Sequence, residues 1–346
     1  MSILSSTLRS VVVSTVVSCQ ADLSALWVLM DALGDTVAFP RLEKFSLEVN
    51  DFLLWPLKLQ APSRMTNLRQ LSILGGTFTD LGILADLSTL PYLEDLKIDF
   101  SPSTTFVTSQ FPSTAFVALK GLGIEAPVLC LHAILEGLPA GGLQSLTITP
   151  LNEPFDLEER RHALLAGCFQ IISSRFSASM ATLIVEYGFV QETSRENAFS
   201  VSLFEPLFEM RNLQKVDLSG LHWTMKTFGD EEFAKFASAW PAIQELKFPS
   251  YRMKATIRTL QSFATECPCL RHLEIPFDGQ PVEESTLPMT SSPLEVLVVG
   301  NTPSPEDELH LARNLDRLFP SLQAAYITLG MITRKLEAVR AEKRAS

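Results

Sequence analysis

Side chains that could carry out chemistry are scattered along this sequence. Cys267 and Cys269 form a Cys-Pro-Cys segment, which lacks the two-residue spacer and the second ligand pair of a zinc site. None of the five histidines has a cysteine or carboxylate at a spacing that would complete a ligand set. We therefore predict no metal site and no cofactor, and we interpret the two cysteines as small residues at a packed corner between a helix and a strand.

The sequence patterns of common catalytic classes are also missing. The sequence contains no phosphate-binding Gly-x-x-x-x-Gly-Lys-[Ser/Thr], no His-Glu-x-x-His and no Gly-x-Ser-x-Gly. Glu158 and Glu159, and the run Asp230, Glu231 and Glu232, stand at the starts of expected helices, where the helix dipole alone explains them. An acid–base pair assembled from distant segments stays open, but the sequence favours a protein that is not an enzyme.

The amino-acid composition indicates which kinds of partner and which cellular compartment to expect for this protein. The 346 residues are 46% hydrophobic, and 28 Lys+Arg against 39 Asp+Glu leave a net charge of −11. This balance argues against nucleic acid or an anionic membrane as the main partner. Five cysteines do not suggest a disulfide framework, so we expect an intracellular location, cytoplasmic or nuclear. An apolar run before Cys19 leaves secretion as the alternative, and no run is long enough for a membrane-spanning helix.

The elements that would position any site come from an internal repeat. One phrase, apolar-x-x-apolar-x-apolar, returns about every 24 to 37 residues. Its copies begin at Leu42, Leu68, Leu93, Leu119, Leu143, Met180, Leu213, Ile243, Leu270, Leu294 and Leu322, and a twelfth fits at Leu8. The alternation at the end of each phrase predicts a strand with one buried face, and stacking such strands in parallel gives each one a neighbour.

The segments between the phrases contain expected helices and loops. Helical spacing of apolar residues predicts helices over residues 157–175, 231–239, 253–266 and 304–318, the last with Ser304 as N-cap. Residues 50–62 and 100–115 are rich in Pro, Ser and Thr, so we expect them to be irregular. The longer steps predict insertions at residues 150–157 and 188–200. We expect one solenoid domain of about 12 units over residues 1–329, then a C-terminal helix or tail over residues 330–346.

Three phrases carry a family resemblance. They begin at Phe39-Pro40, Trp240-Pro241 and Cys267-Pro268, and each continues as x-apolar-x-x-apolar-x-apolar. They resemble leucine-rich repeats, and more narrowly the irregular repeat region of fungal F-box proteins. The resemblance covers residues 8–327. It implies an α/β fold, the right-handed leucine-rich-repeat horseshoe of the ribonuclease-inhibitor type, and a role as the substrate-recognition adaptor of a ubiquitin ligase.

The sequence departs from that family in two respects. The Asn or Cys that regular repeats place three residues after the phrase occurs at Asn50, whereas Gly76 and Ser101 stand at two of the matching sites. The F-box module itself is not seen, because the repeats start by residue 8. Either the module lies outside this chain or the protein works without it.

Repeat geometry also predicts a binding surface. Residues between the buried strand positions would point onto the concave face of the sheet, and we expect this face to bind a protein partner. The candidates are Lys44, Gln70, Asp95, Lys97, Gly121, Gly123, Ser145, Thr147, Lys215, Asp217, Glu245, Lys247, His272 and Glu274. The small residues Gly121, Gly123, Ser145 and Thr147 form either a seat for a peptide or a relief of crowding on a curved sheet.

Two interpretations of function follow. The first is a non-catalytic protein-interaction scaffold, with the F-box type of substrate recognition on the concave face. The alternative is a regulator of an enzyme, of the inhibitor or GTPase-activating kind, for which Arg9 and Arg41 are the early exposed candidates. For the apolar positions Val296, Val298 and Tyr326, we expect either a further contact surface or a cover supplied by the C-terminal helix.

Overall fold

A computed structural model defines the fold over most of the chain. It describes residues 7–15, 24, 28–29, 32–33, 39–49, 64–105, 115–151, 158–186, 201–221, 228–248, 255–277, 287–300, 308–327 and 332–345. The insertion expected at residues 150–157 is wrong at its start, because residues 150 and 151 belong to a strand. Its remainder lies outside these ranges, as do the insertion expected at residues 188–200, the N-cap at Ser304, the loop over residues 50–62 and Cys19.

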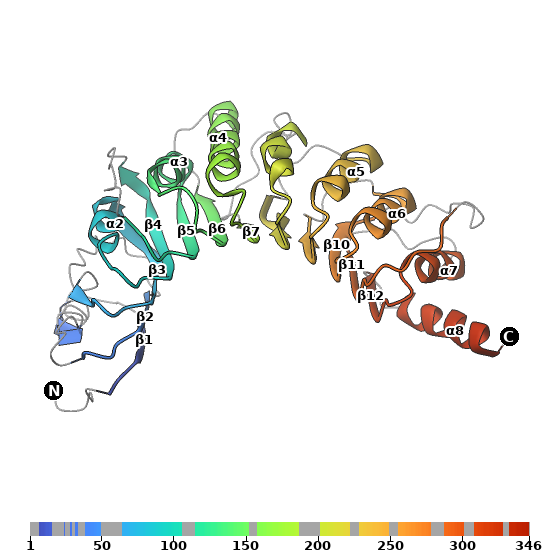
Figure 1. Ribbon diagram of the computed structural model, residues 1–346, viewed down its shortest axis with the longest axis horizontal. Coiled ribbons are helices and arrows are strands. Elements are labelled where there is room, and N and C mark those ends of the chain that lie inside the picture. The colour runs from blue at the N-terminus through green and yellow to red at the C-terminus, as the bar shows by residue number, and fades with distance from the viewer. Residues whose placement is uncertain are drawn as a thin grey trace. The chain divides into compact units, whose positions relative to one another are not determined.

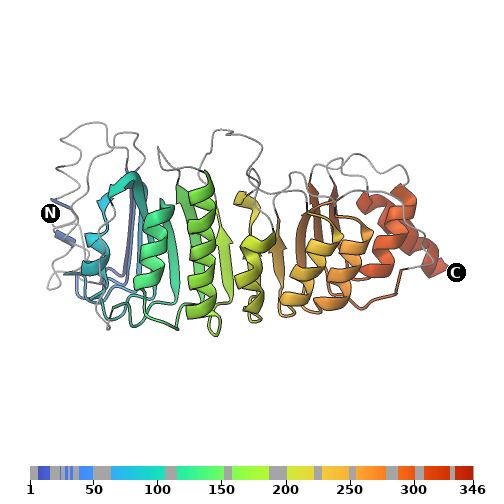
Figure 2. The same ribbon diagram turned by 90° about the horizontal axis from the view of Figure 1, so that it is seen from above.

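The chain divides into two compact units, Met1–Ser179 and Met180–Ser346. In each unit, parallel strands follow one another in sequence order, with helices on one side of them (Figures 1 and 2). The first unit contains β1 (Ser10–Thr15), β2 (Lys44–Val49), β3 (Gln70–Asp80), β4 (Asp95–Thr105), β5 (Gly121–Pro127) and β6 (Ser145–Leu151). The second contains β7 (Thr182–Val185), β8 (Lys215–Asp217), β9 (Glu245–Lys247), β10 (His272–Pro276), β11 (Val296–Gly300) and β12 (Ala324–Ile327).

Each of the twelve described strands falls on one copy of the phrase, so the predicted parallel strands are confirmed, including the one at Leu8. Neighbouring strands pair so that equivalent phrase positions stand opposite each other, as in Phe45 beside Leu71 and Leu71 beside Leu96. The expectation of irregular structure over residues 100–115 is wrong at its start, because β4 continues to Thr105. There Thr104 donates its hydroxyl to the carbonyl of Phe78 on β3 at 2.8 Å, which supports the longer strand.

Helices return the chain between strands. They are α2 (Gly82–Leu87), α3 (Val128–Gly137), α4 (Glu158–Phe176), the 3₁₀ helices η2 (Val201–Glu209) and η3 (Ser219–Leu221), α5 (Asp230–Ala239), α6 (Ile257–Glu266), α7 (Glu308–Leu318) and α8 (Ile332–Ala345). The helices expected over 157–175, 231–239 and 253–266 are confirmed with small shifts of their bounds, and α7 covers the described part of 304–318. No helix was predicted at α2, α3, η2 or η3, and η2 contains Pro206.

Apolar strand positions form the core under the helices. In the first unit Phe45, Leu71 and Leu96 are almost fully buried. A buried side chain of this size stabilises the fold by about 1.5–3 kcal/mol relative to an exposed one. The core of the second unit is aromatic: Phe236 packs edge-on against Phe204, with 5.6 Å between ring centroids, and contacts Trp240 at 5.3 Å.

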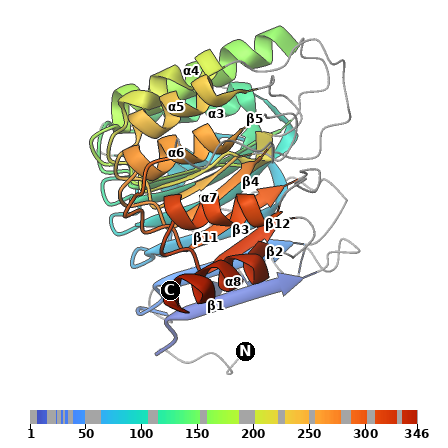
Figure 3. The ribbon, with the colours of Figure 1, turned by 90° about the vertical axis from the view of Figure 1, so that its right-hand side faces the viewer.

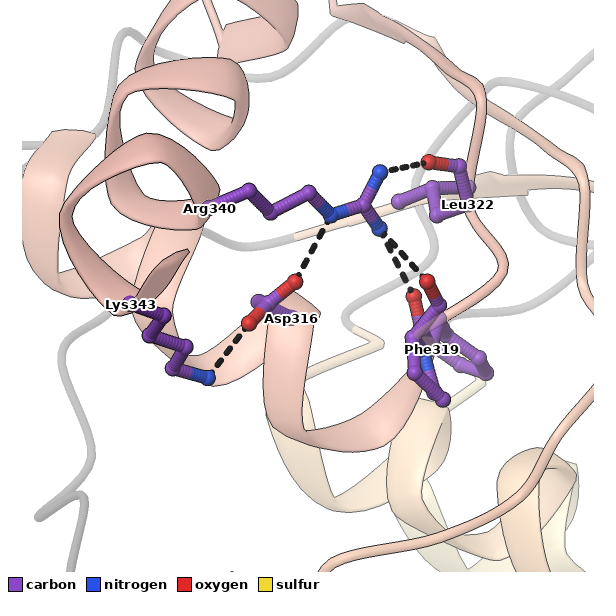
Figure 4. A network of polar contacts seen from close by, with 6 residues as sticks. Asp316, Phe319, Leu322, Arg340 and Lys343 are labelled. Atoms are coloured by element: carbon purple, nitrogen blue, oxygen red, sulfur yellow. Dashed lines mark hydrogen bonds and ion pairs between the residues drawn. The ribbon is translucent and has the colours of Figure 1, made fainter. Parts of the chain in front are cut away.

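The C-terminal helix α8 is packed and is not a frayed tail. It lies beside α7 and β12 (Figure 3). Its Leu336 and Val339 side chains are buried. Figure 4 shows Arg340 reaching from α8 to the carboxylate of Asp316 on α7, with 2.8 Å between Nε and Oδ1. The Arg340 guanidinium also donates to the carbonyl of Leu322 at 2.7 Å and to that of Pro320 at 2.9 Å. These contacts attach α8 to the end of α7 and to the turn that follows it.

No helix within the described residues combines the length and the apolar character that crossing a membrane requires.

Candidate functional site

The two faces of the strands differ in what covers them. Phe45, Leu47 and Val49 on β2 are buried toward the helices, whereas the intervening Lys44 and Glu48 are exposed. The same alternation recurs along the other strands of both units, because successive strand side chains point to opposite faces. We call the side opposite the helices the open face.

All fourteen predicted partner-binding residues lie on the open face and are exposed or partly exposed. In the first unit they form two rows across neighbouring strands: Lys44, Gln70, Asp95, Gly121 and Ser145 in one, and Lys97, Gly123 and Thr147 in the other. In the second unit the rows are Lys215, Glu245 and His272, and Asp217, Lys247 and Glu274. The strand register therefore brings together residues that lie about one repeat apart in the sequence.

The glycines of β5 accommodate side chains from β4. A Cβ atom added at Gly121 would lie 2.2 Å from Oδ1 of Asp95, and one at Gly123 would lie 3.1 Å from Cγ of Lys97. The Asp95 carboxylate also accepts a hydrogen bond from the side-chain amide of Gln70 at 3.2 Å. Asp95 and Lys97 thus lie over the space that the two glycines leave. This geometry favours relief of crowding over an empty seat for a peptide.

The open face of the second unit carries a charged cluster of four residues. Nζ of Lys215 lies 2.9 Å from the carboxylate of Glu245 on the next strand. Nζ of Lys247 lies 3.0 Å from Glu245 and 3.6 Å from Asp217. Cations and anions therefore alternate across β8 and β9, and each holds its neighbour in position.

The ion pairs affect the pKa values of Glu245 and Lys247 more strongly than their partial burial does. Burial alone would raise the pKa of Glu245, but hydrogen bonds from Lys215 and Lys247 lower it, and the pKa lies below its ordinary value. Burial would lower the pKa of Lys247, but Glu245, Asp217 and Glu274 raise it above its ordinary value. Both shifts favour the charged forms of Glu245 and Lys247, so these two groups stay ionised at neutral pH.

The open face changes from polar residues on β10 to apolar residues on β11. His272 and Glu274 on β10 stand beside Val296 and Val298 on β11, and both valines are partly exposed. Nε2 of His272 is buried and has no hydrogen-bond partner among the described residues. The side chain of Tyr326 lies outside the described part of the structure.

Sequence reasoning missed a second set of charges. The residues immediately before β1 to β5 are Arg9, Glu43, Arg69, Glu94 and Lys120, which we call the edge ladder. Arg9 lies 3.6 Å from Glu43, Arg69 pairs with Glu94, and Lys120 lies 2.9 Å from Glu94. The signal was present, since the second phrase position alternates in sign over the first five copies, from Arg9 to Lys120.

The remaining candidates have structural explanations. Cys267 is buried, with Sγ 3.4 Å from the carbonyl oxygen of Ala237, and burial raises the pKa of its thiol to about 12. Cys269 is exposed, so only Cys267 matches the expected packed corner. Asp230 accepts hydrogen bonds from the backbone N–H of Thr256 at 2.9 Å and from its hydroxyl at 2.8 Å. Within the described ranges no three metal-binding side chains cluster.

The two arginines named for the GTPase-activating alternative lie in different settings. Arg9 belongs to the edge ladder, and its side chain is 67% exposed. Arg41 is exposed in the turn that leads into β2.

Comparison with protein-family models and with curated proteins found no match.

Proposed function

We propose that this protein is a non-catalytic scaffold that binds a protein partner on the open face of its sheet. The observation that carries the proposal is the four-residue charged cluster of Lys215, Asp217, Glu245 and Lys247. Its side chains are held by strand-to-strand ion pairs and still reach solvent.

The physical reason is preorganisation. Side chains that already hold fixed positions lose little conformational freedom when a partner binds, so less of the interaction energy is spent on ordering them. Alternating charges of fixed position also select a partner whose charges are complementary and disfavour other partners. Val296 and Val298, which lie on β11 beyond β10, would supply apolar contact area to the same interface.

We place the protein in the leucine-rich-repeat class, with F-box-like substrate recognition for a ubiquitin ligase as its specific role. The repeated phrase, and the parallel strands and helices that alternate along the chain, support this assignment. An intracellular location fits the free cysteines Cys130, Cys168 and Cys267, which are buried as thiols. Co-purification of ubiquitin-ligase components with the protein tagged at its own gene, so that any segment outside this chain is included, would support the ligase role, and a partner set without ligase components would contradict it.

The open face is tested by quantitative pull-down from native extract. Lys97→Glu and Lys247→Gln each change one open-face charge, one in each unit. Arg258→Glu changes an exposed charge on α6 and serves as the matched control. We expect one or more partners to be lost by at least about fivefold with an open-face variant and retained with the control, which corresponds to about 1 kcal/mol.

Circular dichroism of each variant establishes that the fold is retained. Identical partner sets for the wild type and for both open-face variants would contradict binding on the open face.

A further inference from the structure

Strand β1 lies at the end of the strand order of the first unit (Figure 1). Its pairing with β2 is parallel and runs over all six residues of each strand. Among the described residues, no strand pairs with its other edge. The outer edge of β1 is therefore a place where an extended segment could join the sheet.

A repeated hydrogen-bond pattern shows which groups face that edge. The carbonyl of each edge-ladder residue accepts two successive backbone N–H groups from the next strand. Glu43 and Lys44 both donate to Arg9, each at 2.9 Å, and Arg69 and Gln70 donate to Glu43 at 2.7 and 3.0 Å. The same pairs of bonds continue to Gln144 and Ser145, which donate to Lys120.

By the same pattern, the N–H groups of Arg9 and Ser10 are aligned to donate to a strand placed before β1. Within the part of the chain that the structure describes, neither group has a backbone acceptor. An added parallel strand would supply that acceptor through one carbonyl and would copy the register of every later pair.

The edge ladder also predicts which charge such a strand should carry. Its signs alternate from Arg9 through Glu43, Arg69 and Glu94 to Lys120, so an added strand would continue the series with an acid beside Arg9. The guanidinium of Arg9 has room for this second contact, because it is 67% exposed and lies 3.6 Å from Glu43.

The sequence of β1 suits strand addition. Ser10–Thr15 reads SVVVST, with no charge, no proline and no glycine, whereas solvent-exposed edges are usually protected by lysine or proline. Val12 is 72% exposed on the open face, and Val11 and Val13 are only partly covered. An added strand would need apolar residues beside Val11 and Val13.

We propose that the outer edge of β1 binds an extended segment of a partner protein by parallel strand addition. The segment has the pattern acid-x-apolar-x-apolar. Its acid pairs with Arg9, the carbonyl of that acid accepts the N–H groups of Arg9 and Ser10, and its two apolar residues lie beside Val11 and Val13. Main-chain hydrogen bonds provide the affinity, and the acid sets the register.

The probe is a fluorescently labelled peptide with the sequence of residues 42–49, LEKFSLEV, which contains this pattern. Binding to the full chain is followed by fluorescence anisotropy, and hydrogen exchange locates the site. We expect the peptide to bind and to slow exchange of the amides of residues 9–15. A peptide with Lys in place of the first Glu should bind about threefold more weakly, the range of an exposed ion pair.

Two protein variants separate strand addition from a general effect on the fold. Ser10→Pro removes the outward N–H at the first residue of an edge strand, where proline is tolerated, and should weaken binding about fivefold or more. Ser10→Ala keeps that N–H and is the matched control. Arg9→Glu should reverse the preference, so that the Lys peptide binds more tightly than the Glu peptide.

Absence of binding, binding without protection of residues 9–15, or equal binding by Ser10→Pro and Ser10→Ala would overturn the proposal. Self-association of the chain that Ser10→Pro abolishes would assign the edge to a second copy instead, and would also overturn it. These results do not bear on the open face, which is tested with different variants and partners.

Discussion

At the scale of single residues, the open face is organised by contacts between neighbouring strands. Glu245 contacts Lys215 on β8 and also Lys247, which stands two residues further along β9. Asp95 lies over Gly121 because glycine leaves the space that its carboxylate fills. Each of these side chains has its position set by a partner about one repeat away.

The contact of Asp95 with Gly121 predicts an energetic coupling. Gly121→Ala should change stability little, because two effects oppose each other. Alanine lowers the conformational entropy of the unfolded chain, which stabilises the fold, but its Cβ atom would crowd the Asp95 carboxylate. In an Asp95→Ala background the same substitution should stabilise the protein, by about 0.4–1 kcal/mol. Urea unfolding of the wild type, both single variants and the double variant measures this coupling. Additive effects would show that Asp95 does not restrict position 121.

Asp230 predicts a pH-dependent contribution to stability. Partial burial would raise the pKa of this carboxyl, but hydrogen bonds from Thr259 and Thr256 lower it, and it lies below the ordinary value of 3.8. Its contribution is therefore complete above that value and is lost as the pH falls through the lowered pKa. Asp230→Ala should lower the free energy of unfolding by about 1–2 kcal/mol at pH 7.

The difference between wild type and Asp230→Ala should shrink as the pH falls below about 4. Urea unfolding between pH 7 and pH 3 measures it. Glu231→Ala, which removes an exposed carboxylate from the same helix turn, should have a smaller effect. A difference that stays constant over this range would contradict the assigned role of the carboxylate.

At the scale of elements, the strands could be predicted and several connections could not. Leu96 and Ile98 are separated by one exposed residue, and this alternation specifies both the strand and its buried face. The extension of β4 to Thr105 depends on the bond from Thr104 to Phe78, 26 residues earlier. The packing of α8 depends on Asp316, 24 residues before Arg340. Contacts at such separations leave no local periodicity.

Attachment of α8 should depend on Arg340. Its guanidinium bonds to Asp316 and to the carbonyls that follow α7, so Arg340→Ala leaves a carboxylate with less compensation in a largely buried site. We expect a loss of about 1–3 kcal/mol and faster hydrogen exchange in residues 332–345. Arg344→Ala, which removes an exposed arginine from the same helix, is the control. Equal exchange in the two variants would contradict the role given to Arg340.

The candidate site was predictable as a set of positions and not as a set of contacts. Alternation alone assigned Lys215 and Lys247 to the open face, because it fixes which side chains leave the core. It did not indicate that both bind Glu245, since register between strands follows from the whole pairing. The edge ladder was missed because Glu43 and Arg69 precede their strands and fall outside the alternation.

At the scale of the whole molecule, the chain divides into two compact units, Met1–Ser179 and Met180–Ser346. In a repeat array each element mainly contacts its sequence neighbours, so a local defect should remain local. Leu246→Ala, at a fully buried site of β9, should cost about 2–5 kcal/mol. We expect hydrogen-exchange protection to fall in β8 to β10 and to persist in β3 to β5.

The exposed Gln244, next to β9, provides the matched variant Gln244→Ala, which should leave exchange in all strands unchanged. Equal loss of protection in both units after Leu246→Ala would show that they unfold as one cooperative structure.

The repeated pair of bonds to each edge-ladder carbonyl has an evolutionary consequence. From β1 to β6, each edge-ladder carbonyl accepts the same two donors from the start of the next strand. A genetic duplication or loss of one complete repeat would therefore leave a joint of the same kind. A one-residue deletion inside a strand would instead turn its apolar side chains toward water. Selection should therefore accept the gain or loss of a whole repeat more readily than the insertion or deletion of a single residue within a strand.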